Sequence, residues 1–162
     1  EVALGMKKAV AFRAASHVND FLPMSSRDVT QFEGAAKAWR LAYNQANIAV
    51  NDLDVVEVHD CFTIAELLIY EAMGLAEKGK GGTVIAEGVS AKDGRLPINP
   101  SGGLKSKGHP IGATGVSMHV MAAMQVRGDA GPLQVSGAEI AGVFNMGGSA
   151  VANYTSILEA AR

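Results

Sequence analysis

The residues best suited to chemistry are one cysteine, two histidines and a run of glycines. They stand in three short segments, His59-Asp60-Cys61-Phe62, Gly108-His109-Pro110 and Asn145-Met146-Gly147-Gly148. Acyl transfer needs a thiol or hydroxyl, an imidazole to move a proton, and amide donors for a developing oxyanion. The three segments together hold this set of groups, although each has a simpler explanation when taken alone.

A lone cysteine such as Cys61 is often a small buried hydrophobe. It precedes a predicted helix, however, and helix amides with a nearby imidazole would lower its thiol pKa. His109 lies between glycine and proline at another predicted helix start, where the helix dipole favours a neutral ring able to act as a base or a donor. His17 and His119 have no partners at ligand spacing, so we interpret both as structural.

The glycines of the third segment predict a tight hairpin. Gly147 and Gly148 would supply positive backbone angles, and the same turn would expose N–H groups to an oxyanion. The structural and the chemical interpretation are therefore compatible at this segment.

The elements around these segments are predicted from apolar periodicity and capping signals. Strands are expected at residues 8–18, 55–58, 139–145 and 150–158, with very short ones at 82–85 and 96–99. Helices are expected at 31–46, 63–73 and 110–127, the first two opened by capping boxes (Thr30 with Glu33, Thr63 with Glu66) and the last by Pro110. Gly74 and Gly128 are predicted helix stops.

This order, βαβα(β)αββ, predicts an α/β domain whose sheet is largely parallel with one antiparallel edge. Ligands of open α/β sheets bind beyond the carboxyl ends of the strands. The three segments are therefore expected to meet at that edge.

Composition narrows the class of protein. A chain of 162 residues with 48% apolar and 19% charged residues has the size and hydrophobicity of one globular domain. A net charge of -2 without a basic stripe argues against nucleic acid as a partner. A single cysteine excludes an intramolecular disulfide and argues for a reducing, cytoplasmic location. The uncharged run 108–126 contains proline, histidines and glycines, so no membrane span is expected.

Residues 99–115, which end in Gly-His-Pro-Ile-Gly-Ala-Thr-Gly, resemble a signature of the thiolase superfamily. The segment His59-Asp60-Cys61-Phe62 resembles the version of a second thiolase motif found in the sterol carrier protein or non-specific lipid-transfer branch. Asn145 stands where ordinary thiolases have the cysteine of Cys-x-Gly. The resemblance covers essentially the whole chain but only the C-terminal half of a thiolase.

The resemblance implies a five-stranded βαβαβαββ half, with residues 1–162 as one thiolase C-terminal domain. An N-terminal half of the same topology would supply the nucleophilic cysteine. Because the chain opens at Glu1 without methionine, it looks like a fragment that would be inactive alone. Coenzyme A thioesters would be the substrates, without a further cofactor or a metal, and the full-length protein would form homo-oligomers.

The same resemblance assigns roles to individual residues. His109 would activate the nucleophile and help to form an oxyanion hole, and Gly147 would donate its amide to a second one. His59 would position a water or oxygen, and Cys61 would shuttle the proton in place of the cysteine that is Asn145 here.

The missing Cys-x-Gly cysteine leaves two alternatives open. One is a thiolase-fold aldolase that acts on coenzyme A esters beside an OB-fold partner. The other is a non-catalytic scaffold that binds coenzyme A or organises a complex.

Overall fold

The computed structural model describes Met6 and residues 8–161, so the expectations attached to Glu1 and to the chain end at Arg162 lie outside the described residues. The strands are β1 (Val10–Asn19), β2 (Val55–Val58), β3 (Ile140–Gly147) and β4 (Ala152–Ala160). The helices are α1 (Glu33–Ala46), α2 (Thr63–Ala72), α3 (Gly81–Ala86), α4 (Gly103–Lys107) and α5 (Thr114–Val126). Among the described residues, none of the helices has the length and hydrophobicity needed to cross a membrane.

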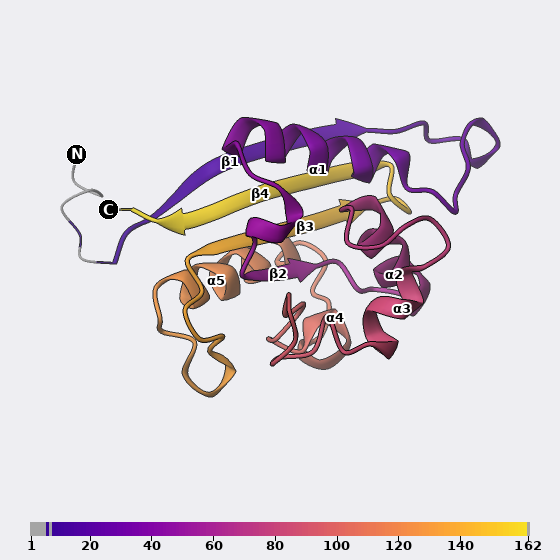
Figure 1. The fold of residues 1–162 in the computed structure, drawn as a ribbon. Coiled ribbons are helices and arrows are strands. Elements are labelled where there is room, and N and C mark those ends of the chain that lie inside the picture. The colour runs from indigo at the N-terminus through magenta and orange to yellow at the C-terminus, as the bar shows by residue number, and fades with distance from the viewer. Residues whose placement is uncertain (1–5, 7, 162) are drawn as a thin grey trace.

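The four strands form one mixed sheet in the order β1-β4-β3-β2 (Figure 1). β2 pairs with β3 in parallel, whereas β4 pairs antiparallel with both β1 and β3. Three strands therefore run in one direction, as predicted, but the antiparallel strand lies inside the sheet and not at its edge. Most of β4 is buried, which suits an internal strand, whereas alternate side chains of β1 are exposed.

The expected fifth strand is reduced to a single contact. Ile98 forms an isolated parallel bridge with Val56, since Pro97 O accepts from Val56 N and Asn99 N donates to Val56 O. Proline has no N–H to donate, which limits this segment to a short contact. The other short strand, expected at residues 82–85, is instead the helix α3.

Helices cover both faces of the sheet (Figure 1). α1 packs on β1 and β4, and α5 packs on β2, β3 and β4 from the other side. Neighbouring side chains of β3 point to opposite faces of the sheet. Val143 belongs to the core cluster beneath α5, and Phe144 belongs to the core cluster beneath α1, where it contacts Trp39. Because of this alternation, the same strand contributes side chains to the core under α1 and to the core under α5.

The predicted capping boxes are absent. α1 begins after Phe32, which has a left-handed φ of 46° and no side-chain cap, and the carboxylate of Asp20 accepts from Gly34 N. Phe62, the residue before α2, likewise has no side-chain cap. Glu66 accepts a hydrogen bond from the hydroxyl of Tyr70 instead. A distant carboxylate thus serves the start of α1, and in α2 a contact within the helix takes the place of the predicted cap.

The helix expected from Pro110 begins four residues later, at Thr114. The carbonyl of Pro110 accepts from Ala113 N and Thr114 N and closes a separate turn. His109 consequently lies in a loop before this turn and not at a helix N-terminus. A further helix, α4, was not predicted. The stops at Gly74 and Gly128 are confirmed by φ angles of 82° and 72°.

Candidate active site

The parallel pairing of β2 with β3 brings two of the expected segments together. Val58 is the last residue of β2 and lies opposite Phe144 on β3, so the residues that follow them, His59 and Asn145, become neighbours. His59 Nδ1 lies 2.6 Å from Asn145 Oδ1. An amide oxygen only accepts, so Nδ1 of His59 carries the proton and Nε2 has the free lone pair. Burial lowers the pKa of His59 and keeps the ring neutral.

His109 reaches the same place from the loop between α4 and α5. Its ring meets that of His59 edge to face, with the ring centroids 4.9 Å apart. Its Nδ1 lies 2.7 Å from Thr114 Oγ1. Among the described residues, Nε2 of neither histidine makes a hydrogen bond.

Cys61 lies at the edge of the same site, two residues after His59, and is partly exposed. Burial raises the pKa of its thiol and outweighs the opposing hydrogen bond from Phe62 N–H, while Asp60 raises the pKa and Lys105 lowers it by smaller amounts. The lowered pKa predicted from a nearby helix start is therefore wrong. Cys61 is the only cysteine in the sequence, and as a neutral thiol it is suited to donate a proton.

Gly147 ends β3 beside these groups, but its own φ is not positive. The left-handed residues are Gly148, Ser149 and Ala150, with φ of 60°, 55° and 64°. Gly147 pairs with Ala152 on β4, and its carbonyl accepts from Val151 N. The hairpin was predicted correctly, but its left-handed turn begins one residue later than expected.

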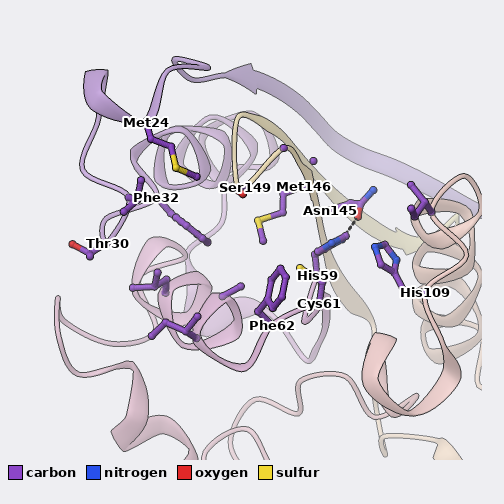
Figure 2. A pocket seen from close by; sticks show the side chains of 17 residues that line it. Met24, Thr30, Phe32, His59, Cys61, Phe62, His109, Asn145, Met146 and Ser149 are labelled. Carbon is purple, nitrogen blue, oxygen red and sulfur yellow. Dashed lines mark hydrogen bonds between the residues drawn. The ribbon is translucent and has the colours of Figure 1, made fainter.

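One cleft of about 680 Å³ is lined by all four predicted site residues, His59, Cys61, His109 and Gly147, together with Asn145 (Figure 2). The figure shows the two histidines and Asn145 at one end, and Met24, Thr30 and Phe32 at the other. The convergence inferred from the three segments is thus present in the structure.

Much of the remaining wall is apolar, and sequence reasoning missed it. The loop after β1 and the helix α2 supply Met24, Val29, Phe32, Ile64 and Leu68. Arg27 ties this loop to the hairpin by donating from Nη2 to Ser149 O at 2.7 Å. No chemical motif marks such residues, because their part in the site depends on a loop packing beside a hairpin more than 100 residues away.

Two buried carboxylates hold the loop that carries His109. Asp60 accepts from Leu104 N at 2.7 Å and Lys105 N at 3.3 Å, and so fixes the start of α4. Glu57, on β2, accepts from the Ser101 hydroxyl at 2.6 Å and lies 3.6 Å from Lys107 Nζ. The acidic residues around His59 therefore anchor the loop and do not themselves line the cleft.

Comparison with known proteins places this geometry in a family. The family model described as "Thiolase C-terminal domain-like" matches residues 15–160. The acetyl-CoA acetyltransferase of Methanothermobacter thermautotrophicus is 46% identical over 123 residues, which are 76% of this chain and 32% of that protein. Human sterol carrier protein 2 is 43% identical over 145 residues, 86% of this chain and 26% of that protein. The non-specific lipid-transfer protein-like 2 of Caenorhabditis elegans is 39% identical over 127 residues, 78% of this chain and 31% of that protein.

A solved structure described as "Ltp2-ChsH2(DUF35) aldolase" superposes with a TM-score of 0.84 over 96% of this chain and 40% of that one. At 23% identity this likeness is one of fold alone. The chain spans about a quarter to a third of the length of the curated relatives named above. The family model matches nearly the whole chain, and several relatives are sterol carrier or lipid-transfer proteins. The chain therefore belongs to the thiolase C-terminal domain-like family.

Proposed function

We propose that this chain is the C-terminal half of a thiolase-like acyltransferase that acts on acyl-CoA and 3-ketoacyl-CoA thioesters. The observation that carries the proposal is the meeting of His59, Cys61, His109 and Gly147 in one cleft. An N-terminal half would supply the nucleophilic cysteine. Family membership supports the class of reaction, since the Methanothermobacter relative is named an acetyl-CoA acetyltransferase.

His109 would start the reaction. Its Nε2 makes no hydrogen bond among the described residues and would take the proton of the nucleophilic thiol. The resulting thiolate attacks the carbonyl carbon, and the protonated Nε2 then donates to the oxygen that becomes negative. One nitrogen thus acts first as base and then as oxyanion donor.

Cys61 would handle the second proton. When a 3-ketoacyl-CoA is cleaved, the bond between C2 and C3 breaks and the electron pair moves to the acetyl-CoA enolate. The neutral Cys61 thiol protonates C2 to give acetyl-CoA, and its thiolate is reprotonated by the incoming coenzyme A thiol as that thiol attacks the acyl-enzyme. The raised pKa of Cys61 suits this donor role.

The surface around the cleft supports a missing partner half. Ile111, Phe62 and Ile64 are 84%, 68% and 59% exposed, and all three line the cleft. On α5, Val116 and Val120 lie one turn apart and are 67% and 51% exposed. Such apolar exposure beside a polar reaction site is typical of a surface that another domain covers.

Steady-state assays of the full-length protein test the proposal. Coenzyme A-dependent cleavage of a 3-ketoacyl-CoA, with acetyl-CoA as one product, is the expected result. Coenzyme A binding without any turnover would contradict it and would favour the scaffold.

A second candidate is retro-aldol cleavage of a 3-hydroxyacyl-CoA. Asn145 favours it, because the cysteine that ordinary thiolases use for proton transfer is absent and His59 Nε2 is available as a base. In that reaction His59 would take the hydroxyl proton, the C2–C3 bond would break, and Cys61 would protonate the enolate. An OB-fold partner would belong to this alternative. Release of an aldehyde or ketone from a 3-hydroxyacyl-CoA, without added coenzyme A, distinguishes it from thiolysis.

A further inference from the structure

The His109 ring is held by a residue that the sequence analysis did not single out. We propose that Thr114 is a positioning residue, which fixes His109 in the tautomer with the proton on Nδ1 and so keeps Nε2 free to accept one. The inference deepens the proposed function and rests on it, because it explains how the proposed base is kept ready.

The direction of the hydrogen bonds follows from the available donors and acceptors. Thr114 Oγ1 lies 2.7 Å from His109 Nδ1 and 3.2 Å from the carbonyl oxygen of Pro110. A carbonyl oxygen can only accept, so the single hydroxyl proton of Thr114 goes to Pro110 O. The ring must then donate from Nδ1. This is the only arrangement in which both contacts are hydrogen bonds.

The local fold holds this pair of hydrogen bonds, from His109 to Thr114 and from Thr114 to Pro110 O, in place. Pro110 O also accepts from Ala113 N and Thr114 N, so the turn before α5 holds the acceptor in place. Thr114 is the first residue of α5, and only 3% of it is exposed. His109, by contrast, is exposed in the cleft. A buried, helix-anchored hydroxyl therefore orients an exposed ring.

These two hydrogen bonds suit a His109 ring that gains and loses a proton at Nε2. Proton uptake at Nε2 leaves the hydrogen bond from Nδ1–H to Thr114 Oγ1 unchanged. Neither this bond nor the one from Thr114 to Pro110 O has to reverse its direction during the reaction. In the opposite tautomer Nε2 would already carry a proton and could not act as a base. Because the ring is already oriented and in the right tautomer, the free energy needed to reorganise it is not added to the barrier of the reaction step.

The second histidine of the site is held by the same device. His59 donates from Nδ1 to Asn145 Oδ1 and also keeps Nε2 free. Asn145 lines the cleft, however, and Thr114 does not. An effect of Thr114 on the reaction must therefore pass through His109, which makes it the cleaner residue to test.

The test measures the tautomer directly by nitrogen-15 NMR of the full-length protein labelled at histidine. The signals of the neutral wild-type His109 ring should show a protonated Nδ1 and an unprotonated Nε2. Thr114→Val removes the hydroxyl and nearly keeps the shape, so it should shift His109 toward the Nε2–H tautomer. Thr114→Ser keeps the hydroxyl and should restore the wild-type signals.

Thr155→Val is the matched control, because Thr155 is 1% exposed and its hydroxyl makes no hydrogen bond among the described residues. It should leave the His109 signals unchanged. Acylation of the full-length protein by acyl-CoA should slow by on the order of 10²-fold in Thr114→Val, which is the scale of a mispositioned reacting group, and should recover in Thr114→Ser.

The outcomes separate this inference from the proposed function. A wild-type His109 with its proton on Nε2, or a Thr114→Val variant with unchanged signals, would overturn the role of Thr114 even in an active enzyme. The wild-type spectrum alone decides the matter if Thr114→Val does not fold. A wild-type protein with the expected tautomer but no acylation would contradict the proposed function and leave the positioning role intact.

Discussion

The ring of His59 stands edge-on to the ring of His109, with the centroids 4.9 Å apart, and this contact joins the end of β2 to the loop before α5. Two imidazolium ions so close together would repel each other. The proximity of His109 adds to the burial that lowers the pKa of His59. His59 therefore stays neutral to a lower pH than an ordinary histidine and keeps Nε2 as an acceptor.

The neutral His59 makes stability depend on pH. The unfolded chain binds a proton near the ordinary histidine pKa of 6.5, whereas folded His59 resists protonation until a lower pH. The unfolded state thus holds more protons in this window, and the free energy of unfolding falls as the pH drops from about 7 through the lowered pKa. Urea unfolding followed by Trp39 fluorescence should show a shallower fall in His59→Asn than in the wild type.

His17→Asn is the control for this experiment, since His17 is an exposed histidine on β1. It should not flatten the pH dependence as His59→Asn does. Equal slopes in the wild type and His59→Asn would mean that the folded protein holds His59 protonated at mildly acidic pH.

Gly103 should be essential for the loop that carries His109. Its φ is 61°, and a Cβ there would come 2.3 Å from Asp60 Oδ2, the carboxylate that holds the first amides of α4. Gly103→Ala should lower the free energy of unfolding by at least about 1–3 kcal/mol, the cost of a left-handed non-glycine residue, with the steric clash added. Thermal unfolding measures the loss.

Gly112→Ala is its matched control in the same motif. A Cβ at Gly112 would meet nothing within 4 Å, and its φ is not positive. A variant Gly103→Ala as stable as Gly112→Ala would show that Asp60 does not closely pack against α4.

Cys61→Ala should leave acylation of the full-length protein largely intact but slow the later protonation of the enolate. General acid catalysis contributes typically about 10²–10⁴-fold, so turnover on a 3-ketoacyl-CoA should fall by that order. Because the thiol pKa lies above its ordinary 9.0, proton donation in the wild type should stay constant through neutral pH and fall only in more alkaline solution. Rapid-quench kinetics separates the two steps, and wild-type turnover in a folded Cys61→Ala would make Cys61 a packing residue.

The chain of residues 1–162 should show no thiolysis on its own. Its single cysteine is the proposed proton donor, and no second thiol remains to form an acyl-enzyme. Coenzyme A-dependent loss of the 3-ketoacyl-CoA enolate absorbance provides the assay. Measurable cleavage would force Cys61 into the role of nucleophile.

Sequence reasoning succeeded where the position of a residue follows from the order of the strands or from a glycine turn. A buried strand ending at Val58 and another running into Asn145 were enough to bring His59 and Gly147 to one sheet edge. It failed where a local pattern was replaced by a distant partner. Thr30 and Glu33 form a perfect capping box in the sequence, yet the side chain of Asp20 serves the start of α1.

The residues that hold the site could not be predicted from spacing. Thr114 serves His109 only because Pro110 closes a turn before α5, and a continuous helix from Pro110 was the expectation. The thiol pKa of Cys61 was expected to be lowered by a helix start, but the burial that raises it depends on the packing of two core clusters around the thiol. Both features need three-dimensional structure, because each depends on which groups surround a side chain.

The most direct measurement of the central claim is mass spectrometry of the full-length protein after incubation with acetyl-CoA. The account predicts one covalent acetyl group on a cysteine outside residues 1–162, and its loss or strong reduction in His109→Ala with the fold retained. An acetyl group on Cys61, an adduct whose formation does not depend on His109, or no adduct at all would contradict the account.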